Sequence, residues 1–259
     1  MRKHLIPAVI MSLFCFNAVQ AQDPIEYGFF DHLSVGVSVG TDGVGFDVAM
    51  PVSHWAALRV GLSMIPEIKY SKSVDISEFR KDTKEITADE VVFEAKPNEG
   101  LNYKILVDFY PFKKSSFHLT GGAYFASTPR FVTAYNTEPF MEEDNWGRTG
   151  VKVGDYKFVT DENGIITANL ESNTVKPYVG LGFGRAVPHK RVNVAFELGA
   201  RFWGEPGVCI NTLDKWGDIE YTKLTKEGLN KKDADQAFDI MSKVIAYPVL
   251  SLRINGRIF

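Results

Sequence analysis

Eight stretches of this chain alternate apolar and polar side chains with a period of two, and this alternation constrains the fold more than any other feature. The clearest example is the range 101–110, with Leu101, Tyr103, Ile105, Val107 and Phe109 on one face and Asn102, Lys104, Asp108 and Tyr110 on the other. Successive residues of a β-strand point to opposite faces, so each stretch has one apolar and one polar face. The sequence therefore predicts an all-β protein whose strands separate two unlike environments.

The eight stretches are predicted as strands of similar length. Their bounds are about His32–Gly40, Val44–Met50, Trp55–Met64, Leu101–Phe112, Phe117–Phe125, Pro177–Val187, Asn193–Trp203 and Tyr247–Phe259. Most approach the ~9–11 residues that a tilted strand needs to cross a bilayer. No hydrophobic run after the N-terminal segment reaches the ~20 residues of a membrane-spanning helix. Residence in a membrane would then depend on strands, which must close into a barrel.

The connections between these strands mostly alternate between short and long. Three short links, 51–54, 113–116 and 188–192, fall at one end of an up-and-down arrangement. Three long segments, 65–100, 126–176 and 204–245, fall at the other end, which also holds the short turn 41–43. Outer-membrane barrels have short periplasmic turns and longer external loops. We therefore predict an eight-stranded antiparallel up-and-down transmembrane β-barrel with three long external loops.

Charged residues on the polar faces indicate which side of the barrel meets lipid. The charged set is Asp47, Arg59, Lys104, Asp108, Glu197, Arg201 and Arg253. An Arg or Lys facing lipid at the bilayer midplane costs roughly 2–4 kcal/mol, so these residues are expected to face the lumen. An eight-stranded barrel is just wide enough for its own side chains. The sequence thus predicts a lumen filled by paired charges, with inward glycines, such as Gly180 and Gly199, leaving room for long side chains.

Aromatic residues gather near the ends of the predicted strands. This set is Trp55, Tyr103, Phe109, Tyr110, Phe117, Phe125, Tyr178, Trp203, Tyr247 and Phe259. Aromatic rings concentrate at both interfaces between membrane and water. We predict that they form two girdles around the barrel. The competing interpretation is that aromatic residues simply favour strands.

The N-terminal segment has the pattern of a secretion signal. Arg2 and Lys3 precede an apolar run from Leu5 to Phe16, and small residues before Gln22 suit cleavage after Ala21. The predicted division is a signal peptide at 1–21 and a barrel domain at 22–259, with an uncleaved anchor and a lipoprotein through Cys15 as alternatives. Cleavage leaves 27 basic and 32 acidic residues and Cys209 as the remaining cysteine, so neither an internal disulfide nor nucleic-acid binding is expected.

None of the segments shows a motif for catalysis or for a cofactor. His118 is expected to face the lumen and does not belong to a recognisable serine-containing catalytic motif. The run Asp161–Gly164 lacks the carboxylate spacing of a calcium loop. It indicates instead a hairpin turn between strands at 156–160 and 165–170. The range 232–244 has the spacing of an amphipathic helix. Mixed charges in 65–100 suit a solvated surface or ion bridges to lipopolysaccharide. We expect no catalytic residue, no cofactor and no bound metal.

Three features of the chain resemble the small outer-membrane β-barrel family of Gram-negative bacteria, the OmpA-like or porin-like group. They are the strand Asn102–Phe112, the glycine-rich run Pro177–Gly184 and the terminal Phe259. The resemblance covers about Tyr27 to Phe259. It implies residence in the outer membrane among its lipid and lipopolysaccharide, and insertion by the barrel-assembly machinery, which reads the last strand. In that strand Leu250, Leu252 and Ile254 lead in register to Ile258, so either Gly256 forms a bulge or Phe259 lies outside the alternation.

The sequence supports a non-enzymatic integral barrel that acts in envelope integrity, or in surface interaction through its external loops with a ligand that the sequence does not name. A narrow porin-like channel for small or amphipathic solutes is the alternative. A lipid-modifying barrel enzyme and a soluble barrel that carries a ligand are further hypotheses.

Overall fold

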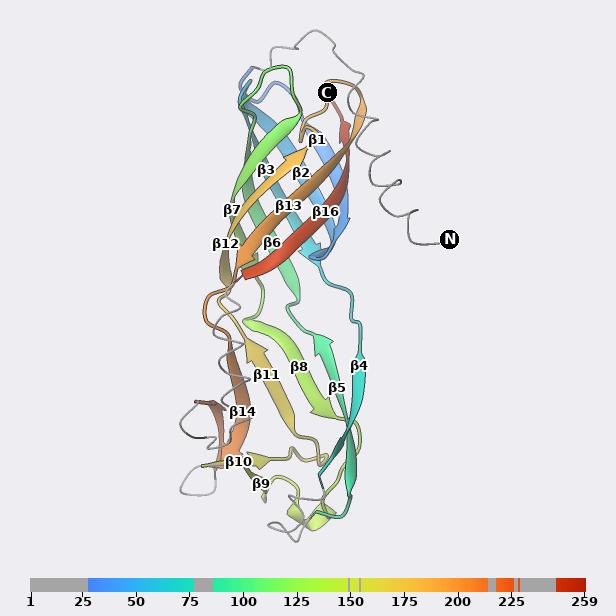
Figure 1. Cartoon of the computed structure of the whole chain (residues 1–259), viewed down its shortest axis with the longest axis vertical. Coiled ribbons are helices and arrows are strands. Elements are labelled where there is room, and N and C mark those ends of the chain that lie inside the picture. The colour runs from blue at the N-terminus through green and yellow to red at the C-terminus, as the bar shows by residue number, and fades with distance from the viewer. Residues whose placement is uncertain are drawn as a thin grey trace, which may run out of the picture.

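A closed antiparallel barrel of eight strands forms one end of the molecule (Figure 1). The computed structural model describes residues 28–76, 86–148, 150–153, 155–213, 218–225, 228 and 246–259. The barrel strands are β1 (Ser34–Gly40), β2 (Gly43–Ser53), β3 (Ala56–Met64), β6 (Leu101–Phe109), β7 (Phe117–Ala126), β12 (Val175–Phe183), β13 (Val192–Phe202) and β16 (Ala246–Arg257). β1 closes the ring on β16, from Ser34 opposite Arg257 to Gly40 opposite Ser251. The predicted strand number and topology are confirmed.

Several strand ends differ from the predicted bounds, and the sequence explains three of these differences. β6 stops at Phe109, because Pro111 lacks the N–H that continued pairing requires. β12 stops at Phe183, since Gly184 adopts a φ of +110° and turns the chain. Phe259 lies beyond the end of β16, and the pairing of β16 with β1 and β13 runs through Gly256 without a shift of register. The bulge alternative for Gly256 is therefore wrong.

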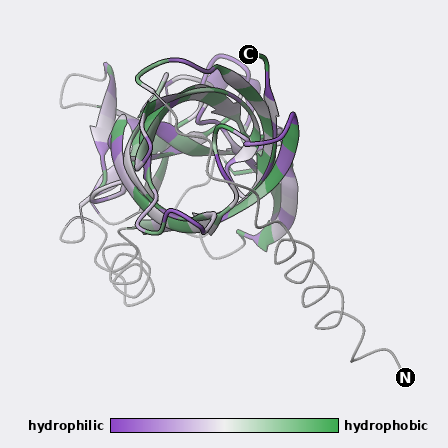
Figure 2. Ribbon diagram, turned by 90° about the horizontal axis from the view of Figure 1, so that it is seen from above, coloured by the Kyte–Doolittle hydropathy of each residue, from purple (hydrophilic) through white to green (hydrophobic). Residues whose placement is uncertain are grey.

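The barrel wall has an apolar outer surface, and alternating hydropathy marks its strands in the view along the barrel (Figure 2). Outward side chains from all eight strands are 38–58% exposed, among them Val37, Val39, Phe46, Val60, Leu62, Ile105, Val107, Leu119, Val179, Leu181, Leu198, Leu250, Leu252 and Ile254. A soluble monomer rarely exposes an apolar patch of more than a few hundred Å². A continuous apolar band around a closed barrel is instead the surface that meets lipid.

The three long segments connect the barrel strands at one end, as predicted, and they also build a second sheet, which the sequence patterns do not predict. Its strands are β4 (Tyr70–Asp75), β5 (Glu90–Pro97), β8 (Arg130–Asn136), β9 (Gly150–Val153), β10 (Tyr156–Val159), β11 (Thr167–Glu171), β14 (Gly207–Leu213) and β15 (Ile219–Lys223). The order is β4-β5-β8-β11-β14-β10-β9, with β15 paired to β14. A single-turn 3-10 helix, η1 (Glu143–Asn145), lies between β8 and β9. We call this second sheet, with its connections, the extension.

The extension continues the barrel wall (Figure 1). Five neighbouring barrel strands each continue along the chain into one strand of the extension: the pairs are β3 and β4, β6 and β5, β7 and β8, β12 and β11, and β13 and β14. The five strands of the extension are neighbours in the same order as their barrel partners. Backbone hydrogen bonds span the short breaks between the two sheets, from Asn98 N to Phe131 O (3.0 Å), Ala126 N to Thr174 O (2.8 Å) and Asn173 N to Trp203 O (2.9 Å). The register of the barrel therefore sets the register of the extension.

The predicted hairpin between 156–160 and 165–170 is only partly right. The turn forms: Gly164 adopts a φ of +75°, and the Asp161 carboxylate accepts hydrogen bonds from the N–H groups of Asn163 and Ile165. The strands that flank the turn do not pair with each other, because β10 pairs with β9 and β14 whereas β11 pairs with β8 and β14. β14, which pairs with both strands, lies about 40 residues further along the chain. A local turn signal carries no information about a pairing partner at that distance.

Two predicted segments, the signal peptide at 1–21 and the amphipathic helix at 232–244, lie outside the described residues. Among the residues that the structure describes, no helix is long and apolar enough to cross a membrane.

The extension has an apolar core of its own. One cluster comprises Ile76, Ile86, Val91, Phe140, Met141, Val151 and Ile166, and a second joins Ile210 and Leu224 to Tyr156, Phe158, Ala168 and Val208. Ile210 is fully buried on β14, whereas Val92 on β5 is 41% exposed. The extension is therefore a packed structure that buries apolar side chains, and not a set of solvated loops.

We predict that Ile210→Ala weakens the extension while the barrel stays folded. Removing a fully buried Ile side chain costs about 2–5 kcal/mol. The measurement is limited proteolysis of the folded protein, followed by electrophoresis without heating, in which a closed barrel keeps its compact mobility. Cleavage within 65–100, 126–176 or 204–245 should accelerate for Ile210→Ala and stay unchanged for the control Val92→Ala. Loss of the compact band would instead mean that the barrel depends on the extension.

Candidate functional site

The structure brings all seven predicted charged residues into the barrel lumen, where each is buried: Asp47, Arg59, Lys104, Asp108, Glu197, Arg201 and Arg253. They come from β2, β3, β6, β13 and β16. Each lies on the parity opposite to the exposed apolar side chains of its strand. The lumen is therefore the most densely charged buried region of the described chain.

A central cluster holds two carboxylates between two guanidinium groups. Arg59 Nη2 donates to Asp108 Oδ1 (2.8 Å) and to Glu197 Oε2 (2.7 Å), and Arg253 Nη1 lies 3.6 Å from Glu197 Oε2. Hydroxyl groups complete the cluster: Tyr178 donates to Glu197 Oε1 (2.7 Å) and Thr120 donates to Asp108 Oδ1 (2.7 Å). These six side chains come from six different strands, so the central cluster cross-links the barrel through its interior.

A second cluster closes the end of the lumen that faces the extension. Glu99, in the break between β5 and β6, accepts hydrogen bonds from Lys176 Nζ and from Arg201 Nη2, the latter at 3.0 Å. The Arg201 guanidinium also lies over the rings of Tyr124 (5.4 Å) and Tyr247 (5.3 Å). Beside it, Trp203 packs on Phe131 with ring centroids 4.5 Å apart. We call this arrangement the mouth cluster, since charge pairs and stacked rings occupy the opening.

Charges in the lumen balance. Lys104 Nζ lies 3.0 Å from Asp47 Oδ1, and Tyr124 donates a hydrogen bond of 3.4 Å to Asp42. With both clusters included, five cations (Arg59, Lys104, Lys176, Arg201 and Arg253) share the lumen with five carboxylates (Asp42, Asp47, Glu99, Asp108 and Glu197) among the described residues. An unpaired buried charge is far more costly than a paired one. The balance is what allows so many charges to be buried together.

Sequence reasoning missed Lys176, Glu99 and Asp42. Lys176 shares the inward parity of Tyr178 on β12, so the alternation contained this signal. Glu99 and Asp42 lie between strands, where no alternation exists to orient a side chain. Only the path of the folded chain places them at the lumen.

Three residues of the predicted aromatic girdle do not face lipid, and this part of the prediction is wrong. Tyr110, Tyr178 and Trp203 are buried. Tyr178 binds Glu197 in the lumen, and the Tyr110 hydroxyl accepts a hydrogen bond from Ala186 N (2.8 Å). Both share a parity with inward charged neighbours, Lys176 and Asp108 respectively. Nearness to a strand end was therefore a poorer guide than parity.

The structure places the other girdle residues at the barrel surface. Trp55, Tyr103, Phe109, Phe125 and Phe259 are exposed, and Phe117 and Tyr247 are half-buried. Tyr247 also contacts Trp203 at the mouth, with ring centroids 5.7 Å apart.

Inward glycines make space for particular side chains. A Cβ atom at Gly180 or Gly199 would overlap the ring of Tyr178, and one at Gly182 would approach the ring of His118 to 2.8 Å. Gly45 and Gly61 leave similar room for Lys104. On the outer face, a Cβ at Gly121 would meet no atom within 4 Å.

We predict that Gly199→Ala destabilises the barrel and that Gly121→Ala does not. The added methyl group at Gly199 must displace the Tyr178 ring and its hydrogen bond to Glu197, and such overpacking costs about 1–3 kcal/mol. The measurement is the urea midpoint of unfolding in lipid vesicles, followed by tryptophan fluorescence. Equal midpoints for the two variants would contradict the packing of Tyr178 described above.

Ligand atoms of Asp108, His118 and Glu197 lie within 4.8 Å of one another, which is a spacing that could hold a metal ion. Both carboxylates already accept hydrogen bonds from Arg59, and Arg253 lies within 3.9 Å of both. A divalent cation would have to enter beside two guanidinium groups. The arrangement therefore suits ion pairing and does not suit a metal ion.

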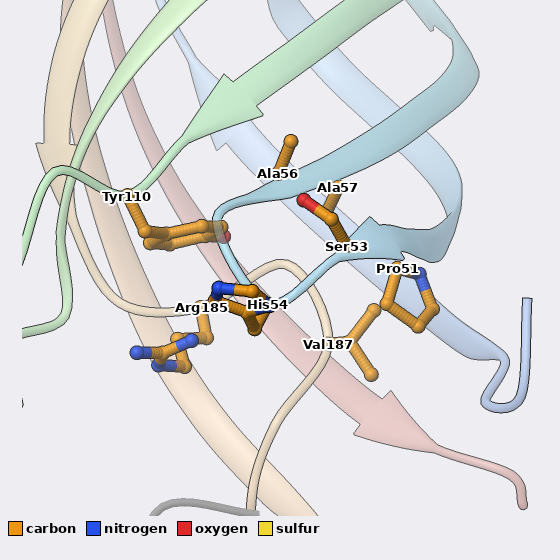
Figure 3. Close-up of a pocket in the computed structure, with 8 residues that line it drawn as sticks. All are labelled: Pro51, Ser53, His54, Ala56, Ala57, Tyr110, Arg185 and Val187. Atoms are coloured by element: carbon orange, nitrogen blue, oxygen red, sulfur yellow. The ribbon is translucent and has the colours of Figure 1, made fainter. Parts of the chain in front are cut away.

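A small hollow among the described residues lies at the opposite end of the barrel, where β1 begins and β16 ends. It is shallow and partly open to solvent, and it is lined by Pro51, Ser53, His54, Ala56, Ala57, Tyr110, Arg185 and Val187 (Figure 3). Arg185 stacks on the Tyr110 ring at 4.8 Å. The lumen itself is occupied by its own side chains.

We predict that Glu197→Gln strongly destabilises the barrel. The change leaves Arg59 and Arg253 with one carboxylate between them, and breaking a buried pair typically costs about 3–5 kcal/mol. Glu205→Gln, which alters an exposed residue of the extension, is the matched control. The measurement is the free energy of unfolding from the urea dependence. A loss below about 1 kcal/mol, the range of surface pairs, would show that the central cluster does not support the fold.

A closed eight-stranded barrel with an apolar exterior and a charged interior defines a class: a transmembrane β-barrel of the small outer-membrane type. No family model and no curated protein matches the chain. Among solved structures, it is similar to Acinetobacter baumannii CarO2, at 18% identity and a TM-score of 0.47, over 87% of this chain and 98% of that one.

Two further solved structures show weaker similarity. Acinetobacter baumannii CarO has 16% identity and a TM-score of 0.46 over 86% of this chain and 96% of that one. A major outer membrane protein from Thermus thermophilus has 14% identity and a TM-score of 0.34 over 87% of this chain and 98% of that one. Identities and TM-scores this low carry no conclusion about function.

Proposed function

We propose that this protein is a non-enzymatic integral barrel of the outer membrane, delivered through a cleaved signal peptide and inserted by the barrel-assembly machinery. Its lumen is closed by side chains. Its role is in envelope integrity or in surface interaction, through the extension that the barrel supports. The observation that carries the proposal is the balanced set of buried charges that fills the lumen, together with the packed sheet built on five strands of the barrel wall.

The lumen supports a closed barrel because its contents are fixed from several sides. The central cluster ties six strands together, and the mouth cluster covers the opening with Glu99, Lys176 and Arg201. A solute would have to break charge pairs in a region of low dielectric constant, where each break is expensive.

The extension supports a role at the surface because its described part is packed around apolar clusters and is strongly acidic. Its described residues within 65–100, 127–174 and 203–225 include seventeen acidic against eight basic side chains. Connections that a folded scaffold such as the barrel holds in place commonly carry binding residues. The acidic surface would favour a cationic partner or the divalent ions that accompany lipopolysaccharide.

A narrow channel is the second candidate, and unsatisfied polar atoms in the lumen favour it. Asp47 Oδ2, Ser63 Oγ, both amide atoms of Asn102 and Arg201 Nε lack a hydrogen-bond partner among the described residues. Buried polar groups of this kind normally bind ordered water. A file of water beside the charge pairs would pass small ions slowly.

His118 gives little support to a barrel enzyme. Its ring contacts the Ser116 carbonyl (3.3 Å) and the Glu197 carboxylate (3.7 Å), and a catalytic base would need to reach a hydroxyl or thiol nucleophile. Hydrolysis of lipid by the purified protein would contradict a non-enzymatic role.

We predict that the purified protein forms no large, long-lived openings in planar lipid bilayers. Glu99→Ala should raise the frequency of openings, because it removes the carboxylate that holds Lys176 and Arg201 at the mouth. Glu205→Ala is the control and should behave as the unaltered protein does. The measurement is single-channel current at fixed voltage. Large stable openings from the unaltered protein would overturn the closed barrel, and brief small ones would favour the narrow channel.

A further inference from the structure

A basic rim surrounds part of the barrel end that is opposite the extension. It comprises Lys113, Lys114, Arg185, Lys190, Arg191 and Arg257. Within the described residues none of the six forms an ion pair with a carboxylate. The described acidic side chain at this end is Asp31, which is engaged with His32 Nδ1 (2.8 Å) and Gly28 N (2.7 Å). The rim therefore carries a local excess of positive charge, although the whole chain has a net charge of −3.

These cations are confined to one sector of the barrel. They come from the β6–β7 turn, the β12–β13 turn and the end of β16, and the strands β6, β7, β12, β13 and β16 are consecutive neighbours in the barrel. Arg185 is buried and joins the two turns by donating to the carbonyls of Lys113 (3.2 Å) and Ser115 (3.3 Å). Lys113, Lys114, Lys190 and Arg191 remain exposed around it. Arg185 thus holds the two turns together, and the exposed cations lie side by side on them; we call this sector the platform.

Aromatic side chains lie directly beside this platform on the outer wall. Phe112 and Phe117 have ring centroids 6.2 Å apart, and Phe117 lies edge-on to Phe183 at 5.4 Å. Lys113 Nζ lies 5.7 Å from the Trp55 ring. Aromatic residues next to exposed cations mark the depth at which acyl chains meet headgroups.

We propose that the basic rim binds the phosphate headgroups of anionic glycerophospholipids, such as phosphatidylglycerol and cardiolipin, with an acyl chain lying against Phe112, Phe117 and Phe183. Cations next to a membrane surface attract anionic lipid, and the headgroup phosphate accepts hydrogen bonds from Lys and Arg.

Both glycerophospholipid and lipopolysaccharide carry phosphate, and the position of the rim favours glycerophospholipid, because the proposed external surface, where lipopolysaccharide lies, is at the end of the extension. The extension, at the other end of the barrel, has seventeen acidic and eight basic described side chains, so the two membrane interfaces meet surfaces of opposite sign. Burial and the nearby Arg185 and Arg257 lower the pKa of His189 to about 4, so this imidazole is neutral at physiological pH and the rim charge comes from Lys and Arg alone. The proposal requires that the barrel spans a membrane. It does not depend on whether the lumen conducts.

The test uses native mass spectrometry of the folded protein, titrated in turn with phosphatidylglycerol, cardiolipin, phosphatidylethanolamine and lipid A. The test variant is Lys113→Gln/Lys114→Gln/Lys190→Gln/Arg191→Gln. The control, Lys69→Gln/Lys72→Gln/Lys96→Gln/Lys157→Gln, removes the same charge from the extension. A third variant, Lys113→Arg/Lys114→Arg/Lys190→Arg/Arg191→Lys, keeps the charge of the rim. Compact mobility without heating shows that each variant is folded.

We expect the unaltered protein, the control and the charge-conserving variant to bind phosphatidylglycerol and cardiolipin about tenfold or more tightly than phosphatidylethanolamine. The test variant should lose this preference. Equal binding of all glycerophospholipids, an unchanged preference in the test variant, or a stronger preference for lipid A would each overturn the proposal.

Discussion

Closure of the backbone on itself is the constraint from which the rest of this structure follows. In hydrocarbon an unpaired N–H or C=O has no water to bind, so a membrane-crossing sheet must have no free edge. Pairing of β1 with β16 over Ser34–Gly40 removes the last edge. Closure also creates an inside and an outside, and each strand must then supply lipid-facing apolar residues on one parity and lumen-filling residues on the other. This requirement is the reason that apolar and polar residues alternate along each strand of the sequence.

The narrow lumen limits what can fill it. Eight strands leave room for side chains only, and the inward parity provides five cations and three carboxylates, to which Asp42 and Glu99 from the connections add the two carboxylates that complete the balance. Glycines opposite them, such as Gly199 opposite the Tyr178 ring, make the volumes fit. The lumen therefore resembles the interior of a soluble domain in its packing and differs from it in polarity. Pairing of the charges offsets the cost of removing them from water.

The barrel could be predicted from sequence because its information is local. In each strand of about nine residues, the alternation itself indicates which side chains face lipid and which face the lumen. A short turn, such as Lys113–Ser116, requires the next strand to pair beside the previous one. The extension could not be predicted, since β8, β11 and β14 are short and pair with strands that are far away in the sequence. Their pairing follows from the order of the barrel strands that they continue. The girdle assignments of Tyr110 and Tyr178 are wrong because position along a strand does not tell which face a side chain occupies, whereas parity does.

The transfer of register from the barrel explains how segments without regular alternation become an ordered sheet. β4, β5, β8, β11 and β14 inherit their order and spacing from five strands whose pairing is already determined, so little further loop-closure entropy must be overcome. The apolar clusters around Ile86 and Ile210 then stabilise a sheet whose strands are already aligned by the barrel. The hydrogen bonds of Asn98, Ala126 and Asn173 that bridge the breaks are where this alignment is transmitted. A small barrel can in this way support a second sheet with its own core, joined to the barrel wall by backbone hydrogen bonds at three breaks.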